Sequence, residues 1–122
     1  MATILCVDDE ATQLMLLRLA LTRAGHEVLE ASDGQIGVEM ATKFQPSLII
    51  MDLMMPKMDG ATAIWHIKQN EATKHIPIIL LSAYVKGDQA KRALDSGAEE
   101  LISKSLILTE LIDKVNHYLR LS

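Results

Sequence analysis

The fold can be argued outward from Leu48-Ile49-Ile50-Met51-Asp52-Leu53-Met54-Met55-Pro56-Lys57-Met58-Asp59-Gly60. An apolar run of this length, bounded by turn residues, predicts a buried strand, so Asp52 stands at the C-terminal end of that strand. Open α/β sheets build their ligand sites at that edge. A carboxylate in this place is a metal ligand, a nucleophile or an accident of sequence, and the rest of the chain must decide among the three.

Five short apolar runs recur along the chain, and each is followed by a polar turn and a helical pattern. The runs are Ile4–Val7, Val28–Ala31, Leu48–Met51, Ile78–Leu81 and Leu101–Ile102. Strands that alternate with helices predict a parallel sheet covered by helices on both faces. Five strands, five helices and short loops use about 120 residues, so we expect one domain over residues 1–122.

Each helical pattern places small or aliphatic residues on one face, and three of the starts are marked. We expect Asp33 to cap the second helix, Asp59 to cap the third and Thr109 to open the fifth, with the fourth near residues 89–96. The expected inward residues, in chain order, are Leu14, Leu17, Leu21, Ala24, Gly37, Met40, Ala41, Phe44, Ala63, Ile64, Ile67, Ala90, Ala93, Leu94, Ile112, Val115 and Leu119.

Composition and charge argue against several classes of protein. Aromatic residues make up only 3% of the chain, which leaves little surface for stacking on bases, and the net charge of −4 comes without a basic run. We therefore expect no direct contact with nucleic acid. No apolar stretch approaches the ~20 residues of a membrane span, and the one cysteine, Cys6, lies in an apolar run. These features predict a cytoplasmic protein with a buried thiol.

Polar residues stand where four of the predicted strands end. They are Asp8, Asp9 and Glu10 after the first strand, Asp52 after the third, Ser82 after the fourth, and Ser103 and Lys104 after the fifth. Parallel strands end at the same edge, so these side chains should converge on one pocket. Two carboxylates about 4 Å apart repel by about 4 kcal/mol at an effective dielectric constant of about 20, so clustered acids take up protons or bind cations. Oxygen ligands select a hard cation such as Mg²⁺.

The same groups suit phosphoryl transfer. A lysine balances the charge of a phosphoryl group, a serine hydroxyl donates a hydrogen bond to it, and a carboxylate can be the nucleophile that forms an acyl phosphate. Taken singly, each residue has an ordinary explanation: Asp8 and Asp9 as an acidic helix start, Lys104 as a surface lysine, Ser82 as a turn residue. Their combination at successive strand ends indicates a site.

With these residues in this order, the chain resembles the receiver domain of two-component response regulators over essentially its whole length. The resemblance rests on Asp8-Asp9, Met51-Asp52-Leu53-Met54-Met55-Pro56, Asp59-Gly60, Ser82-Ala83 and Lys104. It implies a flavodoxin-like, doubly wound sheet of five parallel strands in the order 2-1-3-4-5, with five helices. That order comes with the resemblance and not from the spacing of the apolar runs.

The resemblance also implies roles for the pocket. Asp52 would take a phosphoryl group from a histidine kinase or a histidine phosphotransfer protein, catalysing its own phosphorylation and slow dephosphorylation, so the chain would be an enzyme only in that weak sense. Lys104 would contact the phosphoryl group. Mg²⁺ would be held by Asp9, Asp52 and the backbone carbonyl of Met54, with Asp8 acting partly through water.

A surface away from the pocket would carry the output. Ser82 would swing toward the phosphoryl group and pull the following loop, which holds Ala83 and Tyr84. In the family the responding surface is usually the fourth helix, fifth strand and fifth helix, here about residues 86–119, where a downstream protein would bind. A homodimer that depends on phosphorylation stays open as an alternative.

Two positions depart from the family pattern. Receivers usually carry an aromatic residue three positions before the lysine and a proline directly after it; this chain has Leu101 and Ser105. The aromatic switch is therefore absent, and Tyr84 is the nearest substitute. A non-proline cis bond costs about 3–4 kcal/mol, so we expect a trans bond between Lys104 and Ser105. Met54 and Tyr84 flank the acceptor, and their bulk is expected to shield an acyl phosphate from water.

Three other functions stay open at this point. The first is a pseudo-receiver, a phosphorylation-independent interaction module on the same fold, which the intact set of acids, hydroxyl and lysine disfavours. A Mg²⁺-dependent phosphatase with an aspartyl nucleophile usually has a second acid two residues later, where this chain has Met54. A flavin-binding domain would meet an acidic first turn that repels phosphate.

Overall fold

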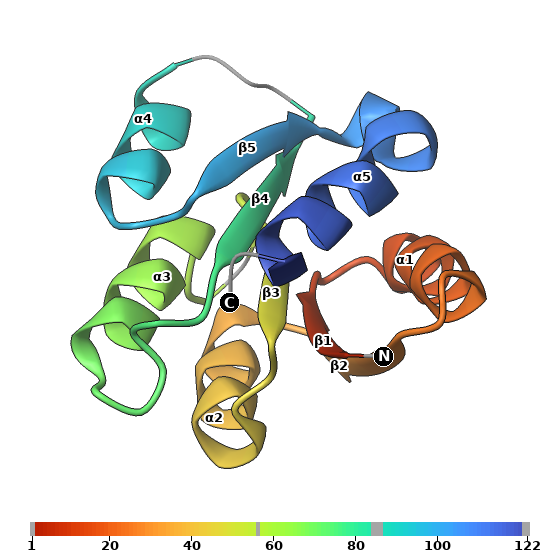
Figure 1. Ribbon diagram of the computed structural model, residues 1–122. Helices are drawn as coiled ribbons and strands as arrows, with labels where there is room; N and C mark the ends of the chain where they lie inside the picture. The colour runs from red at the N-terminus through yellow and green to blue at the C-terminus, as the bar shows by residue number, and fades with distance from the viewer. Residues whose placement is uncertain (1, 56, 84–86, 121–122) are drawn as a thin grey trace.

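The computed structural model describes residues 2–55, 57–83 and 87–120 of the chain. Its sheet contains the parallel strands β1 (Thr3–Val7), β2 (Glu27–Ala31), β3 (Leu48–Asp52), β4 (Ile78–Ser82) and β5 (Glu100–Ser103). The helices that follow them are α1 (Ala11–Arg23), α2 (Gly34–Phe44), α3 (Gly60–Gln69), α4 (Asp88–Asp95) and α5 (Ile107–Arg120) (Figure 1). The strand order β2-β1-β3-β4-β5 confirms the expected doubly wound fold.

The sheet separates two apolar layers, because successive residues of a strand point to opposite faces. Leu5 and Val7 of β1 join the layer beneath α2, α3 and α4, whereas Ile4 and Cys6 join the layer beneath α1 and α5 (Figure 1). Burial raises the pKa of the Cys6 thiol to about 12, which agrees with the expected buried cysteine. Strands β3 and β4 are buried along their whole length, so the C-terminal edge of the sheet is held firmly in place.

Both predicted side-chain caps are confirmed. Asp33 Oδ1 accepts a hydrogen bond from the Ile36 N–H at 2.8 Å, and Asp59 Oδ1 accepts one from the Thr62 N–H at 2.8 Å. Asp59 Oδ2 also pairs with Arg92 of α4 at 2.5 Å. The residue that starts α3 therefore also joins α3 to α4.

Most of the expected inward residues are buried or partly buried, but three are not. Phe44 is 49% exposed, because α2 approaches the sheet through small residues: a Cβ added at Gly37 would lie 2.9 Å from a methyl group of Val7, which leaves no room for a phenyl ring beneath the helix. Leu94 is exposed for a similar reason, since α4 packs through its two buried alanines. Ala24 is exposed because α1 ends one residue before it.

The start of the fifth helix was also predicted wrongly. The helix begins at Ile107 instead of Thr109, and a 3₁₀ turn over Lys104–Leu106 leads into it. The Ser103 hydroxyl accepts a hydrogen bond from the Ser105 N–H and so starts the turn early. Among the described residues no peptide bond is cis, as expected for a chain without a proline after the lysine.

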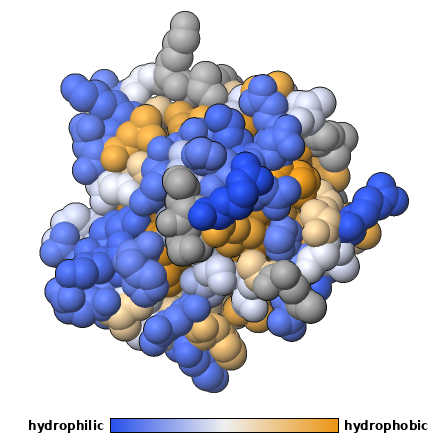
Figure 2. All heavy atoms as spheres, in the orientation of Figure 1, coloured by the Kyte–Doolittle hydropathy of each residue, from blue (hydrophilic) through white to orange (hydrophobic). Residues whose placement is uncertain are grey.

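The surface in the view of Figure 2 is mostly hydrophilic, with hydrophobic atoms visible between the polar groups. The large apolar side chains with the greatest exposure are Met15, Leu19, Phe44, Met54 and Trp65. Among the described helices, none combines the length and the hydropathy that crossing a membrane requires.

Candidate functional site

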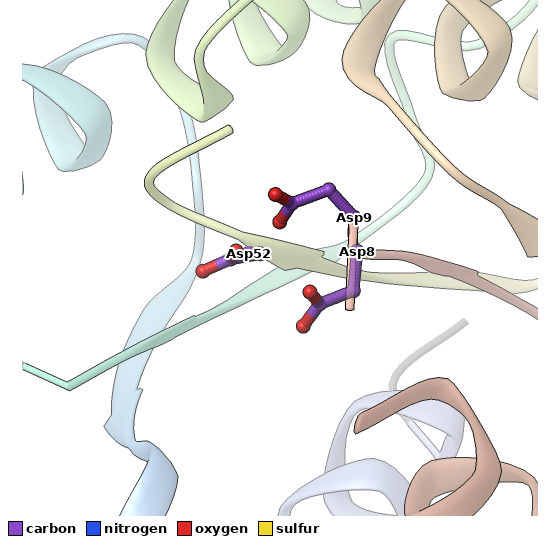
Figure 3. Close-up of side chains that lie close together, drawn as sticks. All are labelled: Asp8, Asp9 and Asp52. Atoms are coloured by element: carbon purple, nitrogen blue, oxygen red, sulfur yellow. The ribbon is translucent and has the colours of Figure 1, made fainter. Parts of the chain in front are cut away.

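Three carboxylates meet at the C-terminal edge of the sheet, at the ends of two neighbouring strands. Asp8 and Asp9 follow β1, and Asp52 is the last residue of β3 (Figure 3). One oxygen from each carboxylate lies within 4.8 Å of the other two. Asp8 and Asp52 are only 1% and 4% exposed, whereas Asp9 is exposed. The fold thus brings together the three acids that the sequence placed at strand ends.

The Lys104 ammonium group lies among these carboxylates. Its Nζ atom is 3.2 Å from Asp52 Oδ1 and 3.6 Å from Asp8 Oδ2. It is also 3.5 Å from Glu10 Oε1, the last acid of the run that follows the first strand. The only signal for this contact in the sequence is the position of Glu10 directly after Asp8 and Asp9. Since Lys104 follows β5, the pocket draws on both β1 and the far edge strand.

Burial and mutual repulsion set the protonation of the buried acids. Burial raises the pKa of Asp52 to about 6; the Asp8 carboxylate adds to the rise, while Lys104 and a hydrogen bond from the Met54 backbone oppose it. Burial also raises the pKa of Asp8. Partial burial lowers the pKa of Lys104, but the carboxylates of Asp52 and Asp8 raise it by more, so the ammonium form is favoured.

The residues fit a divalent cation. All three donors are carboxylate oxygens, the type of ligand that Mg²⁺ prefers. Asp8 Oδ2 is buried and accepts no hydrogen bond, and an unsatisfied buried acceptor is costly. A cation among these oxygens would satisfy that atom and relieve the repulsion that raises the pKa of Asp52.

The other predicted site residues differ in how far they are exposed to solvent. Ser82 is the last residue of β4 and is buried, and Ala83 after it is exposed. Leu101 packs partly buried against the layer beneath α2, α3 and α4. Met54 is exposed, whereas Tyr84 lies outside the described residues. The proposed shielding of an acyl phosphate by Met54 and Tyr84 stays a prediction.

The connection from Asp52 to α3 passes very close to its own strand. The Gly60 N–H donates to the Leu53 carbonyl at 2.9 Å. A Cβ added at Gly60 would lie 2.8 Å from the carbonyl oxygen of Asp52 and 3.1 Å from that of Leu53. These are backbone atoms and cannot move aside as a flexible side chain would, so the sequence needs glycine at this position for space.

We expect Gly60→Ala to lower the free energy of unfolding by about 2–4 kcal/mol, because the backbone that carries Asp52 must shift. Helix propensity alone gives the opposite sign, since alanine is favoured over glycine by about 1 kcal/mol. Urea denaturation measures the difference. The control is Gly25→Ala, at a φ of +95° in open space, where backbone strain alone should cost about 1–2 kcal/mol. Equal losses in the two variants would contradict the steric explanation.

The sequence of the chain is similar to those of a known family of proteins. The chain matches the model of the response regulator receiver domain over residues 4–116. The DNA-binding dual master transcriptional regulator RpaA of Synechocystis sp. is 35% identical over 98% of this chain and 50% of its own length. The chain therefore spans about half of that relative.

Solved structures share the whole fold. A putative response regulator from Chloroflexus aurantiacus J-10-fl has a TM-score of 0.91 and 31% identity, with 98% of each chain covered. The receiver domain of sensor histidine kinase PA1611 from Pseudomonas aeruginosa PAO1 has a TM-score of 0.91 and 25% identity over 97% of each chain. That structure holds a magnesium ion coordinated in its active-site cleft.

Proposed function

Because the chain belongs to the response regulator receiver family, we propose that it is a phosphoacceptor, taking a phosphoryl group from a phosphohistidine onto Asp52 and then switching a protein-interaction surface. The observation that carries this proposal is the Lys104 ammonium 3.2 Å from the buried Asp52 carboxylate. A nucleophile, its counter-charge and two further acids, Asp8 and Asp9, lie in one pocket, which phosphoryl transfer needs for positioning and charge neutralisation.

Asp52 is the nucleophile in this proposal. One of its oxygens bonds to phosphorus while the bond between phosphorus and the histidine nitrogen breaks, and the departing imidazole takes up a proton. The product is an acyl phosphate. Lys104, which pairs with Asp52 beforehand, then pairs with the phosphoryl oxygens, and the Ser82 hydroxyl donates a hydrogen bond to them. Slow hydrolysis releases phosphate and restores the carboxylate.

Mg²⁺ is the proposed cofactor, held by Asp8, Asp9, Asp52 and the backbone carbonyl of Met54. When bound, the ion neutralises part of the charge on the transferring phosphoryl group. The oxygens within 4.8 Å of one another and the unsatisfied Asp8 Oδ2 support this assignment. The magnesium ion in the cleft of the P. aeruginosa receiver is a further support.

The proposed phosphodonor is a histidine kinase or a histidine phosphotransfer protein, and the proposed target is a protein that binds over α4, β5 and α5. Ser82 ends β4 and Lys104 begins the turn between β5 and α5, and these positions next to elements of that surface support the proposal. We place the chain, as one receiver domain over residues 1–122, in the cytoplasm, without direct contact with nucleic acid or membrane.

Intact mass spectrometry tests the proposal. The protein is incubated with Mg²⁺ and acetyl phosphate, and we expect a mass gain of one phosphoryl group that is lost slowly after the donor is removed. Excess chelator should prevent the gain, because the acids would keep their mutual repulsion. A wild-type protein that stays unlabelled, under conditions that label a known receiver, would contradict the proposal and favour a phosphorylation-independent interaction module.

A further inference from the structure

The side chain of Glu10 is not explained by helix capping. Glu10 stands at the N-cap position of α1, yet its carboxylate makes no cap hydrogen bond. Glutamate is not among the residues that favour the N-cap position, so capping gives no reason for an acid here. Its backbone N–H instead donates to Asp8 Oδ1 at 2.9 Å, and its Oε1 lies 3.5 Å from Lys104 Nζ. The carboxylate is therefore engaged with the pocket and not with the helix.

Lys104 is shared by three carboxylates of unequal exposure. The side chains of Asp8 and Asp52 are 1% and 5% exposed and lie against the ammonium from within the protein. The side chain of Glu10 is 62% exposed, and that of Lys104 is 20% exposed. Glu10 is thus the partner on the solvent side of the ammonium, which is the side from which a phosphodonor arrives.

A phosphoryl group that pairs with Lys104 from the solvent side comes close to the negative charge of Glu10. Two unit charges about 6 Å apart in water repel enough to slow association about threefold, and the effect multiplies with each further charge on the donor. Salt screens this repulsion because the groups are exposed. Glu10 should therefore slow the association of a doubly charged donor more than that of a singly charged one.

On the premise of the proposed phosphoacceptor function, we propose that Glu10 is a specificity-determining residue that disfavours free, doubly charged phosphodonors. The favoured substrate class is a phosphohistidine presented by a protein whose own cationic groups offset the charge of Glu10. The residue acts by occupying the open side of Lys104 and by repelling small anions, and it takes no part in bond making.

Labelling rates of Glu10→Gln with two small donors test this inference. Acetyl phosphate is a dianion at neutral pH, whereas phosphoramidate carries a single net negative charge. At low ionic strength we expect the variant to be labelled about tenfold faster than wild type by acetyl phosphate and about threefold faster by phosphoramidate. The ratio between the donors should rise about threefold, and the gain should shrink in about 0.5 M salt.

The control is Glu71→Gln, which makes the same change of net charge. Glu71 is exposed and pairs with Lys74. It lies before the N-terminal end of β4, whereas the pocket is at the C-terminal ends of the strands, so its replacement should leave both rates unchanged. Glu10→Ala is the second variant and should behave as Glu10→Gln does.

The outcomes separate this inference from the function on which it rests. If neither wild type nor Glu10→Gln is labelled by either donor, the proposed function itself fails. If wild type is labelled but Glu10→Gln matches it, or changes both rates by the same factor, or is labelled more slowly, the role of Glu10 is overturned.

Discussion

Asp52→Asn is expected to lose all phosphoryl labelling and yet to be more stable than the wild-type protein. An amide is not a nucleophile toward phosphorus, so the acyl phosphate cannot form. The amide also carries no charge, so the variant avoids burying a carboxylate beside Asp8. Because the two effects have opposite signs, unfolding could not explain the lost labelling.

The gain in stability should depend on pH in a defined direction. In the folded protein the pKa of Asp52 is about 6, whereas an unfolded aspartate has a pKa of about 4. Between these values the folded state binds more protons than the unfolded state, so the contribution of Asp52 to stability falls as pH rises from about 4 to about 6. The full difference amounts to roughly 2–3 kcal/mol at pH 7.

Urea denaturation without Mg²⁺, at several pH values between 4 and 7, measures this difference. The advantage of Asp52→Asn should be close to zero at about pH 4 and reach its full size at about pH 7. Asp113→Asn is the control, since Asp113 is exposed on α5, and we expect no comparable gain. A stability difference that is constant across this range would contradict the assignment of the raised pKa to Asp52.

Lys104→Met is expected to slow labelling by about two to three orders of magnitude, the usual effect of removing one group that stabilises transition-state charge. The metal-free variant should also be less stable than wild type at neutral pH. Lys104 now lowers the pKa values of Asp52 and Asp8, so its loss leaves two buried carboxylates to repel each other without a counter-charge.

Binding of Mg²⁺ separates the loss of this charge from general damage to the site. Lys104→Met removes the ammonium group from among the carboxylates that would bind Mg²⁺. The ion should therefore bind this variant more tightly than wild type, as measured by titration with fluorescence or calorimetry. Lys114→Met is the matched control, because Lys114 pairs with Glu100 at 2.9 Å outside the pocket, and its labelling should be normal. Weaker Mg²⁺ binding by Lys104→Met would indicate a disrupted pocket instead.

The strands were predictable from the sequence, and the helix faces less so. Strands β1, β3 and β4 are buried on both faces and appear as continuous apolar runs. The runs of β2 and β5 are less buried, and they too were placed to within one residue at each end. Phe44 and Leu94 have the right spacing for an inward face, yet both are exposed. Periodicity identifies which face of a helix points inward, but not how closely the helix approaches the sheet. That distance is set by the small residues Gly37, Ala90 and Ala93.

The membership of the pocket was predictable because parallel strands end at one edge. The contact between Glu10 and Lys104 was not, because it depends on the direction of one side chain. The sequence shows that Glu10 directly follows Asp8 and Asp9, but that position does not determine where its side chain points. The need for glycine at position 60 could not be predicted either, since it depends on the path of the backbone beside Asp52.

The placement of the pocket across the sheet has a consequence for biosynthesis. Asp8 follows β1, the first of the five strands of this sheet along the chain, while Lys104 follows β5, the last of the five and an edge of the sheet. If β1 and β3 pair before β5 is made, Asp8 and Asp52 lie together without their ammonium partner, and the pocket is then under electrostatic strain. Pairing of β5 with β4 brings Lys104 beside both carboxylates and relieves that strain, so the charge balance of the pocket is complete only once the edge strand is in place.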